Sequence, residues 1–371
     1  SSTQAVCQFR VRQAFLSLQR ATLSRAAARR SNHGARMQFL AMHLSRSSRH
    51  PLQLTRMFVV GVPRSGTTLL QRLISDNYSY AALPETHFLC GAFGGDHRYH
   101  LGSTVSCAEA IRSISPGGKL AALGISGKSL SARLPSSDSV KLSALMHIIF
   151  DLYSEECANV NLVEKTPMHY QSLELLLNWF PHAKAIWIVR DPRAVASSYL
   201  STPWSDGSVI TPARQWSQQA RILSRVISTN RVMVVSYEKL VREEDRVLES
   251  VASFLGESSE SCIDDRGLRV EVAQMMSEWD VQLYERASQP PDSSAIEKWT
   301  SLLSGNQVKM VESICSAGMS KFQYTPSESI GIFDNVSLAF KRIAYYFVKI
   351  IKRPSLLKHW SKKYLCRVLN K

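Results

Sequence analysis

The chain has 371 residues, 44% of them hydrophobic, which is enough for one large α/β domain with appendages. Its formal net charge of +15 is concentrated at the ends: 12 of the 45 basic residues lie in 1–75 and 10 lie in 335–371, and neither segment has an acidic residue. The body, 76–334, is left with 23 basic and 30 acidic residues, so we expect no nucleic-acid partner, because nucleic-acid binders usually carry a basic face on the folded body.

The spacing of cysteines and histidines indicates neither a zinc site nor a disulfide framework. The 7 cysteines include no CxxC pair, and the 10 histidines are scattered, so we predict no metal. No apolar run reaches about 18 residues, so no transmembrane helix is expected. These features favour a cytoplasmic protein with peripheral membrane contact through its basic ends, and an organelle-targeted or lumenal location is also compatible with them.

Residues 1–54 form a basic N-terminal extension that is rich in Arg, Ser and Ala. Two interpretations fit it, a surface helix that covers part of the body and an organelle transit peptide of similar composition. The first strand of the body is expected at 57–61, because its residues are apolar on both faces, as in a central parallel strand. A loop at 62–66 and a helix over 67–76 should follow.

Strands and helices alternate along the rest of the body, which predicts βαβ units. Strands are expected at 160–164, 185–190 and 232–236, and helices at 138–157, 210–229, 239–255 and 305–317. Residues 91–137 are rich in Gly and Ser, lack periodicity, and are predicted to form an insertion on the substrate side. The predicted fold is a three-layer, P-loop-like α/β domain over 55–330, with a central parallel β-sheet flanked by helices.

The C-terminal residues 331–371 are predicted to form a basic helical extension. Phe340, Ile343, Phe347 and Ile351 recur at helical spacing among Lys and Arg residues. This pattern is typical of an amphipathic helix that lies on an anionic membrane. A helix that docks on the body and leaves its lysines in solvent fits the same pattern.

The segment from Gly61 to Thr68 has the features of a phosphate-binding loop. A buried strand ends, glycines permit a tight turn, and a helix begins, so backbone N–H groups and the helix dipole face one anion. The spacing matches a Walker A loop, but Thr67 occupies the position of the Walker lysine. A nucleotide kinase or NTPase would lack that lysine, whereas Arg64 supplies positive charge from within this loop.

The run Phe58-Val-Val-Gly-Val-Pro-Arg-Ser-Gly-Thr-Thr-Leu-Leu resembles the 5′-phosphosulfate-binding loop of sulfotransferases that use 3′-phosphoadenosine-5′-phosphosulfate (PAPS). It is closer to the PRSGTT form of the tyrosylprotein and bacterial branches than to the PKSGTTW form of the cytosolic enzymes. The resemblance extends over roughly 55–325 and implies PAPS as donor and adenosine 3′,5′-bisphosphate (PAP) as product. The loop residues that it places at the donor are Arg64, Ser65, Gly66, Thr67 and Thr68.

The same resemblance implies a second phosphate site after the strand at 185–190. In the family, an Arg and a Ser eight residues apart hold the 3′-phosphate, and Arg190 and Ser198 have this spacing. A guanidinium offers a forked contact to phosphate, which a hydroxyl can complete. The resemblance also places Tyr237 beside the adenine and Lys298 in a segment that closes over the nucleotide.

Sulfuryl transfer needs a base for the acceptor's proton and cations for the developing charge. Glu85 matches the position of the family's base, whereas His87 is the competing candidate because its ordinary pKa lies near neutrality. Lys165 follows a predicted strand and resembles the lysine that reaches the bridging oxygen and the sulfuryl group. Arg64 is expected to contribute to catalysis, and it could orient Glu85.

We therefore expect a sulfotransferase, with two alternatives. These are a P-loop nucleotide kinase or NTPase, and a non-catalytic protein that binds membrane surfaces through its basic ends. The acceptor classes that stay open are a carbohydrate, a lipid-linked sugar, a small alcohol or amine, and a protein tyrosine, because 91–137 match no pattern that would distinguish them. A homodimer is also compatible with the sequence.

Overall fold

The computed structural model describes residues 56–78, 80–93, 99–157, 161–227, 229–257 and 289–327, together with Tyr345. The predicted extensions 1–54 and 331–371 therefore lie outside the described residues, apart from Tyr345. The chain divides into two compact units, one comprising Ser1–Arg190 and Ile222–Ala295, the other Asp191–Arg221 and Ile296–Lys371. The predicted domain boundaries at 55 and 330 stay predictions.

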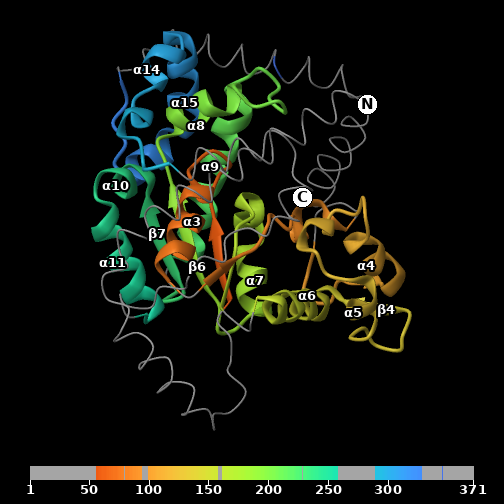
Figure 1. Cartoon of the computed structure of the whole chain (residues 1–371). Coiled ribbons are helices and arrows are strands. Elements are labelled where there is room, and N and C mark those ends of the chain that lie inside the picture. Colours follow the sequence, from red (N-terminus) through yellow and green to blue (C-terminus); the bar gives the residue numbers. More distant parts are fainter. Residues whose placement is uncertain are drawn as a thin grey trace, which may run out of the picture. The chain divides into compact units, whose positions relative to one another are not determined.

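The first unit is built on a five-stranded sheet flanked by helices (Figure 1). In spatial order its strands are β2 (Tyr80–Ala82), β5 (Asn161–Glu164), β1 (Arg56–Val60), β6 (Lys184–Val189) and β7 (Val232–Ser236). Every neighbouring pair in this sheet is parallel, which confirms the predicted α/β fold with a central parallel sheet. Because the strands are parallel, the loops after them start from the same edge of the sheet.

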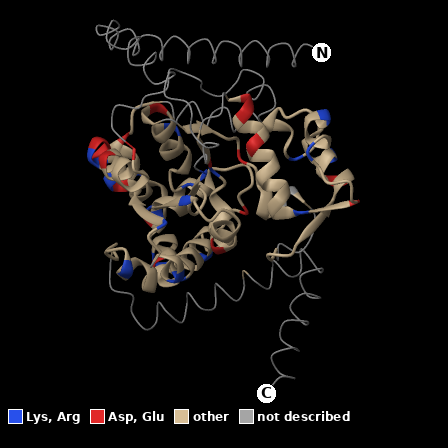
Figure 2. Cartoon of the chain, turned by 90° about the horizontal axis from the view of Figure 1, so that it is seen from below, with Lys and Arg blue, Asp and Glu red and all other residues tan. Residues whose placement is uncertain are grey.

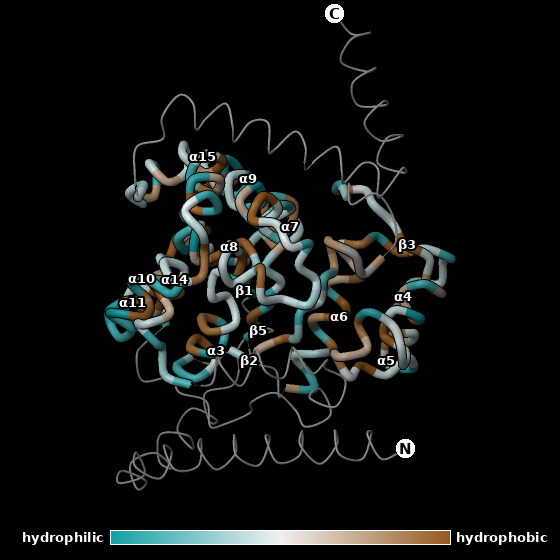
Figure 3. The backbone as a smooth tube through the Cα atoms, turned by 90° about the horizontal axis from the view of Figure 1, so that it is seen from above, coloured by the Kyte–Doolittle hydropathy of each residue, from teal (hydrophilic) through white to brown (hydrophobic). Residues whose placement is uncertain are grey.

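The helices of this unit follow the predicted order, with differences at their ends. They are α3 (Thr67–Asn77), α6 (Leu142–Glu156), α10 (Tyr237–Arg242) and α11 (Glu244–Leu255), and α9 (Ile210–Val226) runs into the unit from the second one. The unit also contains α7 (Leu173–Trp179), which was not predicted. The helix predicted at 239–255 is two helices, because the backbone of Glu243 leaves the helical region, with φ −134° and ψ 50°. In α3, Leu70, Leu73 and Ile74 are buried whereas Asp76 is exposed. Figure 3 shows hydrophobic and hydrophilic stretches along the backbone of this helix.

Aromatic side chains connect the sheet to α6. The Phe58 ring of β1 lies 6.3 Å from the Phe150 ring of α6 and 5.6 Å from the Phe180 ring, measured between centroids. Phe58 and Phe150 are completely buried. Burial of a phenylalanine side chain stabilises a fold by about 1.5–3 kcal/mol. These rings therefore hold β1, and the loop that follows it, against the helical layer.

The segment predicted as an irregular insertion contains regular elements in its described part. They are β3 (Thr104–Ser106), α4 (Cys107–Ile114), the short 3₁₀ helix η3 (Ala121–Leu123), α5 (Gly127–Ser131) and, just after it, β4 (Ser139–Lys141), which pairs antiparallel with β3. Ser106 and Ser126 cap α4 and α5, accepting hydrogen bonds from the amides of Glu109 (3.1 Å) and Ser129 (3.0 Å). In both cases the serine hydroxyl satisfies an amide of the helix N-terminus. Both helices are short, so neither gives a long periodic pattern in the sequence.

The second unit packs α8 (Pro192–Leu200), α14 (Trp299–Leu302) and α15 (Gly305–Lys321) with the first part of α9. A capping box of Ser304 and Gln307 starts α15, which confirms the helix predicted at 305–317. The buried Arg193 side chain joins the unit. Its guanidinium pairs with Asp191 at 2.7 Å and Glu312 at 2.8 Å, and its central carbon lies 4.1 Å from the centre of the Trp299 ring.

Gly318 of α15 allows a close approach between helices within this unit. A Cβ atom there would lie 2.5 Å from Cζ3 of Trp216 and 2.8 Å from Cβ of Ala220. We expect Gly318→Ala to lower the free energy of unfolding by about 1–3 kcal/mol, the usual cost of overpacking. Gly305→Ala is the matched control, because a Cβ at Gly305 would meet no atom within 4 Å. Urea unfolding checks both variants, and equal stabilities would contradict the packing argument.

Acidic and basic residues are interspersed on the described ribbons (Figure 2). Among the helices that the structure describes, none combines the length and hydrophobicity needed to span a bilayer. Within the same residues, no group of three or more His, Cys, Asp or Glu side chains could hold a metal ion.

Candidate active site

The loop between β1 and α3 depends on glycine at two points of close approach. Gly66 has φ +93°, and a Cβ atom on it would lie 2.4 Å from Cδ2 of Tyr237. A Cβ on Gly61 would lie 2.5 Å from the carbonyl oxygen of Ile188 in β6. Arg64 also adopts positive φ, at +77°, which is unfavourable for a residue with a side chain. The conformation of this loop is therefore held by its neighbours rather than by local preference.

The loop also presents hydrogen-bond donors where an anion would bind. The first amide N–H groups of α3 have no partner within the helix and lie at the positive end of its dipole. Thr67 and Thr68, which start α3, are buried. The Ser65 hydroxyl is buried and has no hydrogen-bond partner in the part of the chain that the structure describes. A buried hydroxyl without a partner is costly, so an anion that accepts its hydrogen bond fits this loop.

Arg190, which directly follows β6, joins this loop to Tyr237. Its Nη1 donates to the carbonyl oxygen of Arg64 at 3.1 Å, and its Nη2 donates to the carbonyl oxygen of Ala295 at 2.8 Å. The guanidinium carbon lies 4.2 Å from the centre of the Tyr237 ring, and that ring contacts Gly66. Burial raises the pKa of Tyr237 more than the charge of Arg190 lowers it, so the phenol stays neutral. Three predicted donor-site segments thus lie together.

Two other predicted donor-site residues belong to the second unit. Ser198 lies on α8 and is half-buried, and Lys298 is exposed immediately before α14. Their joint action with Arg190 stays a prediction.

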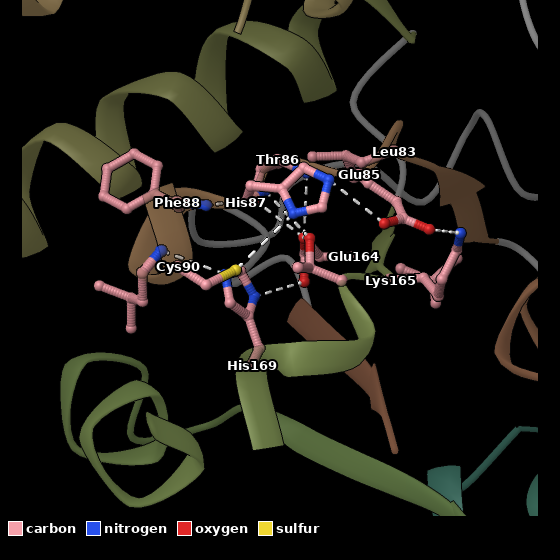
Figure 4. A network of polar contacts seen from close by, with 12 residues as sticks. Leu83, Glu85, Thr86, His87, Phe88, Cys90, Glu164, Lys165 and His169 are labelled. Carbon is pink, nitrogen blue, oxygen red and sulfur yellow. Dashed lines mark hydrogen bonds and ion pairs between the residues drawn. The ribbon is translucent and has the colours of Figure 1, made fainter. Parts of the chain in front are cut away.

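Glu85 and Lys165 form an ion pair (Figure 4). Glu85 lies in the loop after β2, and Lys165 directly follows β5, so both come from neighbouring parallel strands. The amide of Leu83 donates to the carbonyl oxygen of Val163 at 3.0 Å, which extends the strand pairing to the start of the Glu85 loop. The Lys165 side chain is completely buried, whereas 28% of the Glu85 side chain is exposed. The predicted base and the predicted cation therefore meet, with the carboxylate accessible to solvent.

His87 contacts the other oxygen of Glu85. Its Nε2 lies 3.3 Å from Oε2 of Glu85, and its Nδ1 lies 3.7 Å from Sγ of Cys90. The hydrogen bond to Cys90 raises the pKa of His87, burial opposes this, and the negative charge of Glu85 raises the pKa further. A protonated His87 would support the ionised form of Glu85. The contact makes His87 and Glu85 partners, and which of the two is the base stays a prediction.

Behind this pair lies a buried carboxylate that the sequence analysis did not single out. Glu164, the last residue of β5, accepts hydrogen bonds from Oγ1 of Thr86 at 2.9 Å, Oγ1 of Thr166 at 2.5 Å and Nδ1 of His169 at 3.0 Å. Burial would raise the pKa of Glu164, but the positive charge that His169 carries when protonated, together with these hydrogen bonds, acts in the opposite direction and lowers the pKa. Glu164 is therefore ionised at neutral pH.

The protonation of His169 follows from its two nitrogens. Burial lowers the pKa of His169, but the adjacent Glu164 carboxylate and hydrogen bonds to Cys90 and Glu164 outweigh it and raise the pKa to about 10, which by itself would leave the ring protonated at neutral pH. The amide of Leu89, however, donates a hydrogen bond to Nε2 at 3.2 Å, and a proton on Nε2 would leave that buried amide facing another donor. Because of this contact we assign His169 as a neutral ring with its proton on Nδ1.

Comparison with known proteins gives three results. The sulfotransferase family matches residues 56–261, more than half of the chain. Nodulation protein NoeE of Sinorhizobium fredii is 23% identical over 288 residues, which cover 71% of this chain and 64% of NoeE. Protein-tyrosine sulfotransferase of Drosophila melanogaster is 24% identical over 215 residues, covering 55% of this chain and 38% of that protein. The chain thus spans less than two thirds of the length of these curated relatives.

Among solved structures, the sulfotransferase domain from the Synechococcus PCC 7002 olefin synthase resembles this chain with a TM-score of 0.50. The two are 19% identical, and the match covers 73% of this chain and 95% of that domain. At this identity the likeness supports the fold, and the chemistry must be argued from the residues.

Proposed function

The chain belongs to the sulfotransferase family, and we propose that it transfers a sulfuryl group from PAPS to an acceptor hydroxyl or amine by in-line displacement. The observation that carries the choice of donor is the contact of Arg190 with both the phosphate loop and Tyr237. A donor with phosphate groups at both its 5′ and 3′ positions needs two such cationic sites. ATP has no 3′-phosphate and would leave the second cationic site unused.

Donor binding is assigned to two groups of residues. The loop residues hold the 5′-phosphosulfate through backbone amides and hydroxyls, and they are Arg64, Ser65, Gly66, Thr67 and Thr68. The remaining residues hold the 3′-phosphoadenosine part, with Arg190 and Ser198 at the 3′-phosphate, Tyr237 beside the adenine and Lys298 on the closing segment. The unpartnered Ser65 hydroxyl and the ring of Tyr237 against Gly66 support this assignment.

The chemistry is assigned to the ion pair of Glu85 and Lys165. PAPS supplies a sulfuryl group whose bond to the phosphate oxygen breaks as a new bond to the acceptor atom forms. Glu85 takes the proton of the acceptor, and Lys165 stabilises negative charge on the departing oxygen, so that PAP leaves. Arg64 adds positive charge beside the transferring group. His87, 3.3 Å from Glu85, supports the ionised base.

A thermal-shift comparison tests the donor. We expect PAP at about a hundred times its Kd to stabilise the protein by about 2.7 kcal/mol and so to raise Tm by several degrees. Mg-ATP should have little effect, because Thr67 stands where a P-loop kinase or NTPase has its lysine. Adenosine 5′-phosphate, which lacks the 3′-phosphate, should stabilise less than PAP. Stabilisation by Mg-ATP and none by PAP would sink the proposal in favour of the kinase or NTPase alternative.

The acceptor is to be identified by transfer of radiolabelled sulfate to carbohydrates, lipid-linked sugars, small alcohols or amines, and tyrosine peptides. The similarity to a protein-tyrosine sulfotransferase of Drosophila supports including tyrosine. Membrane contact through 331–371 is a separate proposal, which binding to anionic liposomes with and without that segment would test. A homodimer, also proposed, can be measured by sedimentation.

A further inference from the structure

The three backbone amides that follow Glu85 and Thr86 are held by side chains. The amides of residues 87–89 donate, in order, to Oγ1 of Thr166 at 3.2 Å, to Oγ1 of Thr86 at 3.3 Å and to Nε2 of His169 at 3.2 Å. Two of these acceptors lie in the segment after β5, which also carries Lys165. The conformation of the Glu85 loop therefore depends on these side-chain acceptors.

All three acceptors share one further partner, the Glu164 carboxylate. Each of them donates its own hydrogen to Glu164 and accepts a loop amide with its lone pair (Figure 4). An ionised carboxylate can only accept hydrogen bonds, so every group around it must direct its hydrogen inward. The lone pairs of both hydroxyls and of the His169 ring are thereby left for the loop amides. One charged group decides the orientation of the whole network.

We propose that Glu164 is a positioning residue for sulfuryl transfer, which orients Thr86, Thr166 and His169 and so holds Glu85 against Lys165. The proposal rests on the proposed function, in which Glu85 is the base. His87 adopts φ +45° at the turn of this loop, a conformation that costs energy and persists only where the surroundings determine it. Because Lys165 follows Glu164 directly, the same strand end fixes both members of the ion pair.

Substituting Glu164 by Gln keeps the shape of the side chain but replaces one of its two hydrogen-bond acceptors by a donor. The NH2 group of Gln would face a group that already donates a hydrogen bond to Glu164. At least one hydroxyl or the His169 ring must therefore turn away, and it then releases the loop amide that it accepts. We expect at least one of the amides of 87–89 to exchange with deuterium about tenfold faster in Glu164→Gln, because that amide loses its hydrogen bond. Glu155→Gln is the matched control, since Glu155 pairs with Arg133 on the surface of α6.

A second variant covers the case in which Glu164→Gln does not fold. Thr166→Val preserves volume and removes only the hydroxyl that accepts the amide of His87. Faster exchange at residue 87, with residue 88 protected as in the wild type, is the expected result. Unchanged exchange at 87–89 in both variants would overturn the proposal.

Kinetics separate positioning from a purely structural role. With labelled PAPS and 4-nitrophenol as the acceptor probe, Glu164→Gln should lower kcat about a hundredfold, the order expected for a misplaced catalytic group, with little change in KM for PAPS. In the Glu85→Gln background the same substitution should have almost no further effect, because it acts through Glu85. If the two substitutions lowered kcat independently, so that the double variant showed the product of the two single losses, the proposal would be contradicted. Absence of transfer by the wild type to 4-nitrophenol and to every acceptor class of the radiolabelled-sulfate screen would count against the proposed function instead, and the exchange measurement would still decide the role of Glu164.

Discussion

Replacing Glu85 by Gln should lower kcat for sulfuryl transfer by about 10²- to 10⁴-fold, the range that general-base catalysis contributes. The amide cannot accept the acceptor's proton, although it has the size and hydrogen-bonding reach of the carboxylate. The affinity for PAP should stay within a few-fold of the wild type, because Glu85 lies in the loop after β2 and the proposed phosphate loop follows β1. Steady-state kinetics and titration with PAP measure the two quantities separately.

The matched variant for this prediction is His87→Gln. His87 contacts Glu85 at 3.3 Å but is more than half exposed, with 52% of its side chain accessible, and we assign it only a supporting role. Its substitution should therefore reduce kcat far less than Glu85→Gln does. If the two losses were reversed, His87 would be the base and Glu85 its partner. Lys165→Ala should also lower kcat, because the developing charge on the leaving oxygen would lose its cation.

Replacing Gly66 by Ala should weaken PAP binding by about a hundredfold or more, through a steric and a conformational effect. The added Cβ would lie 2.4 Å from the Tyr237 ring, and φ +93° is unfavourable for alanine. Either the loop or Tyr237 must move. Since Arg190 stacks on Tyr237 and binds the carbonyl oxygen of Arg64, both proposed phosphate sites should be disturbed together.

Gly124→Ala is the control for this effect. Gly124 also has positive φ, at +67°, but a Cβ there would meet no atom within 4 Å, and the residue lies in the insertion between β2 and β4. The variant should lose some stability and retain PAP affinity. Calorimetric titration of both variants with PAP makes the comparison. Equal affinities for PAP in Gly66→Ala and the wild type would mean that the loop does not bind the donor as proposed.

The elements with strong local patterns were predicted well. The strands at 57–61, 160–164, 185–190 and 232–236 lie within a residue or so of the observed ones, because buried parallel strands are continuous apolar runs. The insertion was read less well, since α4 and α5 are short and owe their start to serine caps rather than to a long apolar stripe. The single helix predicted over 239–255 missed the break at Glu243, which no Gly or Pro announces.

The residues of the candidate site could be predicted where they belong to a local sequence motif, and less well where they do not. Glu85, Lys165 and Arg190 could be proposed because each matches a position in a motif, and the structure brings Glu85 to Lys165 and Arg190 to the loop. Glu164 and His169 could have been suspected only from their place beside Lys165 at a strand end. A buried carboxylate with three donors becomes visible only when the segments that supply them are brought together.

The sequence by itself determined the proposed phosphate loop, because strand, turn and helix are contiguous in 56–77 and the groups proposed to bind the anion are backbone amides of that same segment. Only the tertiary structure decided which side chains act together. Glu85 and Lys165 are 80 residues apart, and Arg190 and the Arg64 carbonyl are 126 apart. Their contacts follow from the strand order β2-β5-β1-β6-β7, which is set by burial of both sheet faces and not by any local preference.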